Sequence, residues 1–408
     1  MITPNVVGED PLWSRRRLLV SSGAAIGGAL LEMAFPIARA RATESWRSGA
    51  RFLGLVPFVA EGSVPLEQLV DEGLDGRLYT RLDSLRGAPP VVDNARFYVR
   101  TRAPREVVRE LAMPRAREGW RIDVGGLVPR PFALRAGDLA RSATSKPDTL
   151  LECAGNTRHV RFAMMSAARW RGVALADVLD EAHVSPNATS VLVEGVDHRA
   201  PTRASRPGAS WVLRLDEVRE TGAFLATEMN GEPLPLEHGS PVRLIVPGWY
   251  GCASVKWAHR IALVDETERA TDHMREFASR THQHGVPSLA RDFAPPRIDR
   301  AAMPVRVERW AVGDRVQWRI VGIAWGGDRR AAEAPLLVRI GAESGARWER
   351  VDRQLAGDEA AGSGRTWDLW THTCAPRHGR TPIALRVGDV RVPTRRMSAG
   401  HYARIVEA

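Results

Sequence analysis

Lysine and cysteine are both scarce in this chain of 408 residues. Lys146 and Lys256 are the only lysines among 58 basic residues, so a net charge of +10 comes almost wholly from arginine. The arginines are interleaved with aspartate and glutamate and form no dense stripe, which argues against a nucleic-acid-binding protein. We therefore expect a solvated basic surface that attracts anionic substrates or an acidic partner.

The three cysteines, Cys153, Cys252 and Cys374, are too few for a disulfide framework, and no two of them form a Cys-x-x-Cys pair. The sequence thus lacks a Cys-x-x-Cys-His haem motif and a cysteine-rich zinc site. Cys252 and Cys374 can either pair in an oxidising compartment or remain as two buried thiols, and we favour the two thiols.

A long apolar run is also missing. Residues 18–31 are apolar and rich in glycine and alanine, but the run is short for a membrane span. It follows the twin-arginine pattern at residues 14–19 and precedes small-x-small cleavage sites at residues 38–40 and 40–42. These features predict a twin-arginine signal peptide over residues 1–42 and export to the periplasm, with an uncleaved anchor as the alternative.

The length predicts two domains, and the composition, 44% hydrophobic and 26% charged, is that of a globular protein. We expect an α+β fold: an N-terminal arm at 43–95 with a helix at 64–72, a mixed domain at 96–270, a linker at 271–298 and a β-sandwich at 299–408. In the mixed domain, hydrophobic periodicity predicts strands at 120–124, 190–196 and 242–246 and helices at 174–182 and 213–220. In the last domain it predicts strands at 316–325, 336–340, 367–370 and 383–387.

Cys153 stands at the point where a short strand, residues 148–151, enters a turn. Gly155 and Asn156 tolerate turn conformations, and Arg158 and His159 follow closely. Nearby positive charge favours the thiolate form of a cysteine. From these residues alone, Cys153 is a buried structural thiol, a nucleophile or a metal ligand.

Five segments in the same order resemble the sulfite oxidase family of molybdopterin-dependent oxidoreductases: residues 97–100, 152–158, 168–179, 228–243 and 246–257. In that family residues 168–179 would be a helix. The resemblance covers roughly residues 90–265 and, with the signal peptide, points to a twin-arginine-exported bacterial type. It implies a mixed α/β molybdopterin-binding domain followed by an immunoglobulin-like sandwich that often mediates dimerisation. Gly322-x-Ala324-Trp325 is similar to the first strand of that sandwich.

The resemblance also implies roles for individual residues. Cys153 would be the metal ligand, beside two dithiolene sulfurs of a molybdenum–molybdopterin cofactor. The substrate would meet Arg100, Arg158 and an arginine of the last domain, Arg395 or Arg396. The pterin contacts would be Tyr98, Arg100, Thr101, Arg102, Asp197, His238, Arg243, Ser254, Val255 and Lys256.

Physical chemistry supports part of this set. His238 and Arg243 lie across a short turn and can share one phosphate. Guanidinium groups bind small oxyanions in a bidentate manner, which suits arginine at a substrate site. His238 taken alone is equally a hydrogen-bonded structural histidine, and Asp197 taken alone is a turn residue.

The chain departs from the family in three places. Thr101-Arg102 replaces an Asn-His pair, the segment between Cys153 and Trp170 is shorter than usual, and Gln283 falls near an aromatic pocket position. The shorter segment removes a loop that carries a substrate-pocket tryptophan. We therefore expect a retained cofactor site and a rebuilt, more open substrate pocket.

The function implied is oxygen-atom transfer, with sulfite or a related sulfur compound as the substrate. Because the chain has neither a haem motif nor a flavin fingerprint, electrons would pass to an external acceptor, such as a c-type cytochrome. The nearest alternative is an oxide or sulfoxide reductase. Two alternatives from other classes are a hydrolase that uses Cys153 and His159 and a non-catalytic binding module. Molybdenum content separates the first two from the others.

Overall fold

The computed structural model describes most of the chain after residue 47: residues 48–59, 75–86, 91–103, 109, 111, 113, 117–156, 162–198, 208–327, 334–343, 345–355, 366–387 and 404–408. The predicted signal peptide and the predicted helix at 64–72 lie outside these residues. Among the helices of the described part, none is long and apolar enough to span a membrane. Of the described residues, 48–54 with 309–317 form one compact unit, and the others form a second. All site residues discussed below belong to the second unit.

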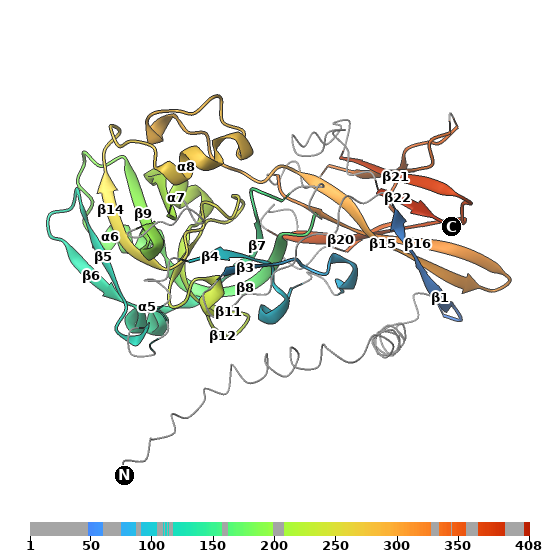
Figure 1. Cartoon of the computed structure of the whole chain (residues 1–408), viewed down its shortest axis with the longest axis horizontal. Coiled ribbons are helices and arrows are strands. Elements are labelled where there is room, and N and C mark those ends of the chain that lie inside the picture. The colour runs from blue at the N-terminus through green and yellow to red at the C-terminus, as the bar shows by residue number, and fades with distance from the viewer. Residues whose placement is uncertain are drawn as a thin grey trace, which may run out of the picture. The chain divides into compact units, whose positions relative to one another are not determined.

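One five-stranded sheet is formed by residues 121–264 (Figure 1). Its strands follow the order β10 (Ser210–Arg214), β9 (Ser190–Gly195), β14 (Ala258–Val264), β5 (Arg121–Gly126) and β6 (Phe132–Arg135). Strand β14 pairs antiparallel with β9 and parallel with β5. Every residue of β9 is buried because the strand lies in the sheet interior and consists mostly of small and apolar side chains.

A second sheet positions Cys153 and Arg243. Its order is β12 (Glu232–Pro233), β11 (Phe224–Met229), β8 (Met165–Ala174) and β7 (Thr144–Glu152), and β13 (Arg243–Ile245) also pairs with β11. A separate two-stranded ladder joins β3 (Asp75–Leu78) to β4 (Val99–Arg102). Strand β7 ends one residue before Cys153, and β13 begins with Arg243.

The α-helices with described bounds are short: α5 (Ala136–Ser142), α6 (Leu175–Glu181), α7 (Leu215–Thr221) and α8 (Asp272–Phe277). Gly222 ends α7 with a left-handed φ of 65°, where a side chain would be strained. Thr271 caps α8 by accepting a hydrogen bond from Met274 N at 3.1 Å. Three 3₁₀ turns also contribute to the site: η4 (Val196–His198), η5 (Leu236–His238) and η6 (Ala278–Arg280).

From residue 301 onward the described structure consists of strands. They are β15 (Ala301–Val312), β16 (Arg315–Trp325), β17 (Leu336–Ile340), β18 (Glu349–Arg350), β19 (Arg353–Leu355), β20 (Trp367–Cys374), β21 (Arg380–Val387) and β22 (Arg404–Glu407). With β1 (Arg51–Val56) and β2 (Phe58–Val59) they make two five-stranded sheets, β1-β15-β16-β20-β19 and β18-β17-β21-β22-β2.

Tryptophan fills the interior of this C-terminal region. Trp318, Trp325, Trp367 and Trp370 are all fully buried. A Cβ atom at Gly322 would lie 2.1 Å from the ring of Trp370, so only glycine lets the indole pack onto β16. Aromatic burial of this size supplies much of the apolar area that stabilises the two sheets.

Most of the predicted elements of residues 120–387 are present, with boundaries shifted by a few residues. One prediction is wrong: residues 168–174 belong to strand β8, and the helix begins only at Leu175. The burial alternates along this strand, with Ala168, Trp170 and Gly172 buried and the two intervening arginines exposed. That two-residue period is the signature of a strand. The structure as a whole has more sheet and less helix than the α+β prediction suggested.

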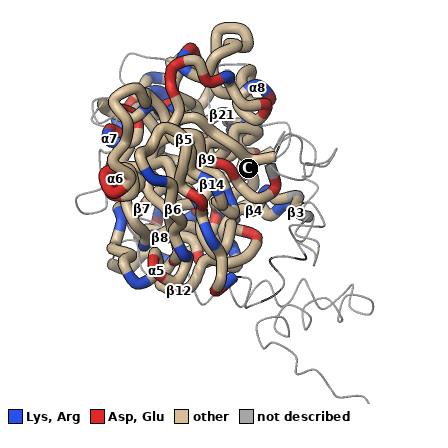
Figure 2. The backbone as a smooth tube through the Cα atoms, turned by 90° about the vertical axis from the view of Figure 1, so that its left-hand side faces the viewer, with Lys and Arg blue, Asp and Glu red and all other residues tan. Residues whose placement is uncertain are grey.

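Charges of both signs alternate on the face that carries β5, β6, β9 and β14 (Figure 2). Arg121 pairs with Asp123 at 3.9 Å, and Arg260 pairs with Glu194. The described residues of this face therefore form no continuous basic stripe.

Candidate functional site

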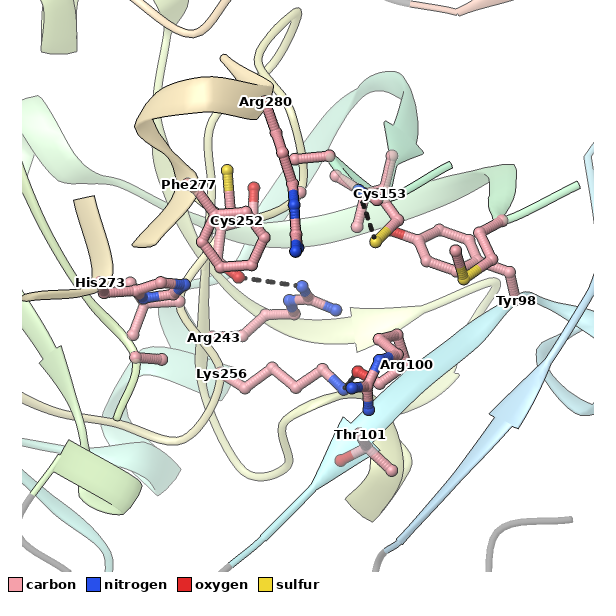
Figure 3. A pocket seen from close by; sticks show the side chains of 18 of the residues that line it. Tyr98, Arg100, Thr101, Cys153, Arg243, Cys252, Lys256, His273, Phe277 and Arg280 are labelled. Atoms are coloured by element: carbon pink, nitrogen blue, oxygen red, sulfur yellow. Dashed lines mark hydrogen bonds between the residues drawn. The ribbon is translucent and has the colours of Figure 1, made fainter. Parts of the chain in front are cut away.

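A cavity of about 620 Å³ lies where the β3–β4 ladder, the turn after β7, the loop 251–257 and the segment α8–η6 meet (Figure 3). Sulfur, guanidinium, ammonium, imidazole and hydroxyl groups all line it. Because the cavity gathers so many polar groups from distant parts of the chain, it is the candidate site.

Cys153 is held by a tight turn. Its N–H donates to Met164 O at 2.9 Å, and its carbonyl accepts from Asn156 N at 2.8 Å. The Asn156 side chain then accepts from Met164 N at 3.1 Å, which ties both ends of the turn together. Gly155 N donates to Cys153 Sγ at 3.3 Å. The turn thus fixes the thiol in the cavity and directs a backbone dipole at the sulfur.

The residue before Cys153 anchors the turn to the interior. Glu152 is buried, and its carboxylate accepts from Asn156 Nδ2 at 3.2 Å and from Trp325 Nε1 at 3.0 Å. Its carbonyl accepts from Gly251 N at 2.8 Å. A buried carboxylate needs such donors. The position of Cys153 therefore depends on a tryptophan of strand β16.

Tyr98 fills the space beside this turn. A Cβ atom at position 251 would approach Tyr98 Oη to 2.9 Å, which explains the glycine there. Burial raises the pKa of Tyr98, and the neighbouring Cys153 thiol raises it further. The phenol consequently stays neutral and available as a hydrogen-bond donor.

Arg243 forms the innermost cation of the cavity and is only 4% exposed. Its Nη1 donates to His238 O at 2.9 Å and its Nη2 donates to Ser254 O at 3.0 Å. Burial lowers the pKa of Arg243 to about 10. Gly239, with φ of 107°, allows the close approach, since a Cβ there would lie 3.1 Å from both the Arg243 and the Lys256 side chain.

Lys256 lies next to Arg243. Its Nζ donates to Glu237 O at 2.6 Å and to Arg100 O at 3.2 Å. Burial lowers the pKa of Lys256 to about 7, and the positive charges of Arg243 and Arg100 lower it as well. The carboxylates of Glu237 and Asp197 act in the opposite direction and raise the pKa of Lys256 in part. A buried arginine beside a half-buried lysine favours binding of an anion.

Two buried polar atoms of the same cavity also lack a hydrogen-bond partner among the described residues. Thr101 Oγ1 and Arg243 Nε have no hydrogen-bond partner within the part of the chain that the structure describes. An anion with several oxygens, such as a phosphate, matches this set of donors. Within the same residues, no three His, Cys, Asp or Glu side chains come together as a metal site. A metal at Cys153 would therefore need soft ligands from a cofactor, as the dithiolene of molybdopterin provides.

Comparison with known proteins agrees with this chemistry. Residues 110–271 match the family described as "Oxidoreductase molybdopterin binding domain". Mitochondrial sulfite oxidase of Rattus norvegicus is 29% identical over 287 residues, which cover 65% of this chain and 51% of the relative. Macaca fascicularis sulfite oxidase is 30% identical over 265 residues, which cover 60% of this chain and 48% of the relative. Residues 110–271 thus carry a molybdopterin-binding oxidoreductase domain, and the chain is similar to the sulfite oxidases.

Two further matches extend this comparison. The NADPH nitrate reductase of Aspergillus niger is 32% identical over 229 residues, covering 53% of this chain and 23% of that protein. The crystal structure of the sulfane dehydrogenase SoxCD from Paracoccus pantotrophus superposes with a TM-score of 0.58 at 20% identity, over 80% of this chain and 79% of that chain. This last likeness is one of fold. The chain spans about half the length of the sulfite oxidases that it matches.

The structure brings together nearly all the residues that the family resemblance selected. Cys153 and all the predicted pterin contacts except Arg102 line the one cavity. Arg102 is the last residue of β4, and its side chain is outside the described part. Arg158 and Arg395, like His159 and Arg396, also lie outside the described residues, so their predicted roles stay predictions.

Several cavity residues were not predicted. Arg77 faces Arg100 directly across the β3–β4 ladder, and both line the cavity. Like charges directly opposite one another destabilise a ladder, so an anion between them would stabilise it. Pairing of β3 with β4 could not be predicted, because the sequence between them carries no hairpin signal.

The segment α8–η6 is the second source of unpredicted residues. It contributes His273, Phe277 and Arg280, although we assigned it to a linker. Gln283 does not line the cavity: its amide bonds to the backbone of Ala294 at 2.7 Å in both directions, and His282 takes the cavity position instead. All three cysteines are free thiols, and Cys252 lines the cavity too.

Proposed function

We propose that this protein is an exported molybdenum-cofactor oxidoreductase that transfers an oxygen atom to a small anionic sulfur compound, such as sulfite, and passes the electrons to an external acceptor. The observation that carries the proposal is the pairing of a fixed thiol, Cys153, with the buried Arg243 and the half-buried Lys256 in one cavity. A soft ligand and an anion site at opposite ends suit a metal-bearing cofactor with a phosphate tail.

Different residues would hold the phosphate and the metal of the cofactor. Arg243, Lys256 and Thr101 would bind the phosphate, and burial strengthens each of these charge-assisted contacts. Cys153 would ligate the metal through its thiolate. When bound, the molybdenum cofactor supplies oxygen-atom transfer coupled to a two-electron change. Tyr98 stays neutral beside the thiol and can donate a hydrogen bond there without adding charge.

The proposed export, electron acceptor and homodimer rest on the sequence. The twin-arginine pattern at residues 14–19 supports export of a folded protein that has already received its cofactor. A c-type cytochrome is the proposed electron acceptor, because the chain carries no haem or flavin motif. The strands from β15 onward would form an immunoglobulin-like sandwich that makes a homodimer.

Steady-state kinetics test the proposal. We expect sulfite oxidation with an artificial one-electron acceptor, and an apparent affinity that weakens between low and high ionic strength, because an open, wet pocket is screened by salt. The nitrate reductases among the relatives support a second candidate, reduction of an oxide or sulfoxide. A molybdenum-loaded sample that oxidises no sulfur compound but reduces an oxide with an artificial donor would favour that candidate. A sample with no molybdenum at all would favour a non-catalytic binding module.

A further inference from the structure

Two arginines contact one tryptophan on the sheet β18-β17-β21-β22-β2, outside the cavity of the candidate site. The guanidinium carbons of Arg339, on β17, and Arg386, on β21, each lie 5.0 Å from the ring centroid of Trp348. The two guanidinium groups are therefore no further apart than twice that distance. Contacts between a cation and an aromatic ring hold both charges at one place on the sheet.

The pairing of the strands explains why these side chains meet. Leu337 of β17 lies opposite Arg386 of β21 on one side and opposite Arg350 of β18 on the other. Arg339 is two residues further along β17, so its side chain points to the same face as that of Leu337. Val338, between them, is 1% exposed and points to the interior. The outward face thus carries a set of residues that we call the Trp348 patch: Arg339, Trp348, Arg350 and Arg386.

The arginines of the patch have no counter-charge in the part of the chain that the structure describes. None of them forms an ion pair or donates a hydrogen bond there, and Arg339 Nε and Arg386 Nε are buried atoms without an acceptor. The neighbouring carboxylate of Glu349 lies 3.6 Å from His372 Nε2 instead. The side chains of Arg339 and Arg386 are half-buried. Contact with the ring, and not hydrogen bonding within the fold, therefore holds these two positive charges.

An acidic protein segment fits this patch. Carboxylates bind guanidinium groups in a bidentate manner, which suits arginine better than lysine. Tryptophan and arginine are also enriched where protein interfaces concentrate their binding energy. Nucleic acid is a poorer match, because its phosphates call for cations along a track and these cations surround one ring. A two-fold dimer through the patch would place arginine against arginine, since both copies would present the same surface.

We propose that the Trp348 patch docks an acidic segment of a protein partner, whose carboxylates pair with Arg339 and Arg386. Trp348 holds the two guanidinium groups in place and adds apolar contact. The inference does not depend on the chemistry of the cavity, because no residue of the patch lines it. It therefore goes beyond the proposed function and is tested separately from it.

The test uses four purified full-length proteins: wild type, Arg339→Gln/Arg386→Gln, Trp348→Leu and Arg130→Gln/Arg135→Gln. The last is the charge-matched control, because Arg130 and Arg135 are exposed, lie outside the cavity and belong to the region of strand β6, in another sheet. The probe is a fluorescein-labelled peptide of six glutamates, with a peptide of six glutamines as its neutral counterpart. Fluorescence anisotropy measures binding at low and moderate ionic strength. Thermal unfolding checks that each variant is folded.

We expect the wild type to prefer the glutamate peptide, with an affinity that weakens as the salt concentration rises. The Arg339→Gln/Arg386→Gln variant should bind it about tenfold more weakly, since two half-exposed ion pairs are lost. Trp348→Leu should bind about threefold more weakly, because the arginines lose the ring that holds them. The Arg130→Gln/Arg135→Gln control should stay within about twofold of the wild type, as for exposed charges far from the contact.

Three results would overturn the inference: no preference of the wild type for the glutamate peptide, equal losses in the patch and control variants, or tighter binding of a single-stranded oligonucleotide of equal charge that the patch variant loses. A dimer of the wild type that dissociates in Arg339→Gln/Arg386→Gln, seen by analytical ultracentrifugation, would also overturn it and assign the patch to self-association. Molybdenum content should be the same in all four proteins. Its absence from all of them would reject the proposed function and leave the docking site intact.

Discussion

The two ends of the cavity are built in different ways. At the phosphate end, Arg243 is 4% exposed and fixed by two carbonyls, and Thr101 is equally buried. At the thiol end, Cys153 is half-buried and Arg280 is exposed. Strands β4 and β13 and the residues Ser254 to Lys256 make the first end, and turns and a short helix make the second. Under the proposed function, this contrast would suit a cofactor held tightly at one end and a substrate that exchanges at the other.

The largest effect expected is on the thiol end. Cys153→Ser should lower turnover by at least about 100-fold, because a hard hydroxyl replaces the soft anionic ligand of the metal. Molybdenum should remain bound, since the phosphate contacts are intact. Turnover and molybdenum analysis of the same sample check this. Cys252→Ser is the control in the same cavity, and an equal loss in both variants would mean that neither thiol is a ligand.

Arg243→Ala should affect the phosphate end of the cavity. Loss of a charge-assisted bond to a buried phosphate costs about 1.5–3 kcal/mol, so cofactor should be retained about 10- to 100-fold more weakly. Molybdenum content after gel filtration measures this. Arg306→Ala removes another buried arginine, one that pairs with Glu308 at 2.6 Å away from the cavity. Equal loss of molybdenum in that variant would assign the effect to general destabilisation.

Lys256 makes the phosphate end sensitive to pH. Its pKa falls to about 7 from 10.5 on folding. Between these values the unfolded chain binds the proton and the folded protein does not, so the free energy of unfolding rises with pH. Below pH 7 both states are protonated, and the folded state bears the whole cost of the buried charge.

Lys256→Met should therefore remove part of this rise in cofactor-free protein. We expect a difference of about 1 kcal/mol between pH 6 and pH 8.5, a discounted value because the side chain is only half-buried. Urea unfolding at both values measures it, with Lys146→Met as the control. An unchanged pH dependence in Lys256→Met would contradict the lowered pKa of Lys256 in the folded protein.

The smallest effect expected is at Thr101. Thr101→Val removes a buried hydroxyl that has no partner in the described residues. Cofactor-free protein should be as stable or more stable by about 1 kcal/mol, while cofactor retention weakens about fivefold through one lost hydrogen bond. Thr227→Val is the matched control, since its buried hydroxyl also lacks a described partner and lies outside the cavity. Parallel behaviour of the two variants would argue against a ligand at Thr101.

The sequence predicted the parts of the site that local pattern determines. Gly155 and Asn156 indicated the turn at Cys153, and alternation of apolar residues indicated most strands. The sequence did not predict contacts between segments that are far apart along the chain. Arg280 is one of many arginines in a polar stretch, so its type alone carries no signal. The bond from Trp325 to Glu152 spans 173 positions and depends on packing that no local pattern describes.

The molybdenum content of the wild-type protein tests the central claim most directly. Protein purified from a host that makes the cofactor should carry close to one molybdenum per chain, by metal analysis against protein concentration. Arg243→Ala should carry far less under the same conditions. A wild-type protein from that host with no molybdenum would contradict the account, because the cations at Arg243 and Lys256 would then have another partner.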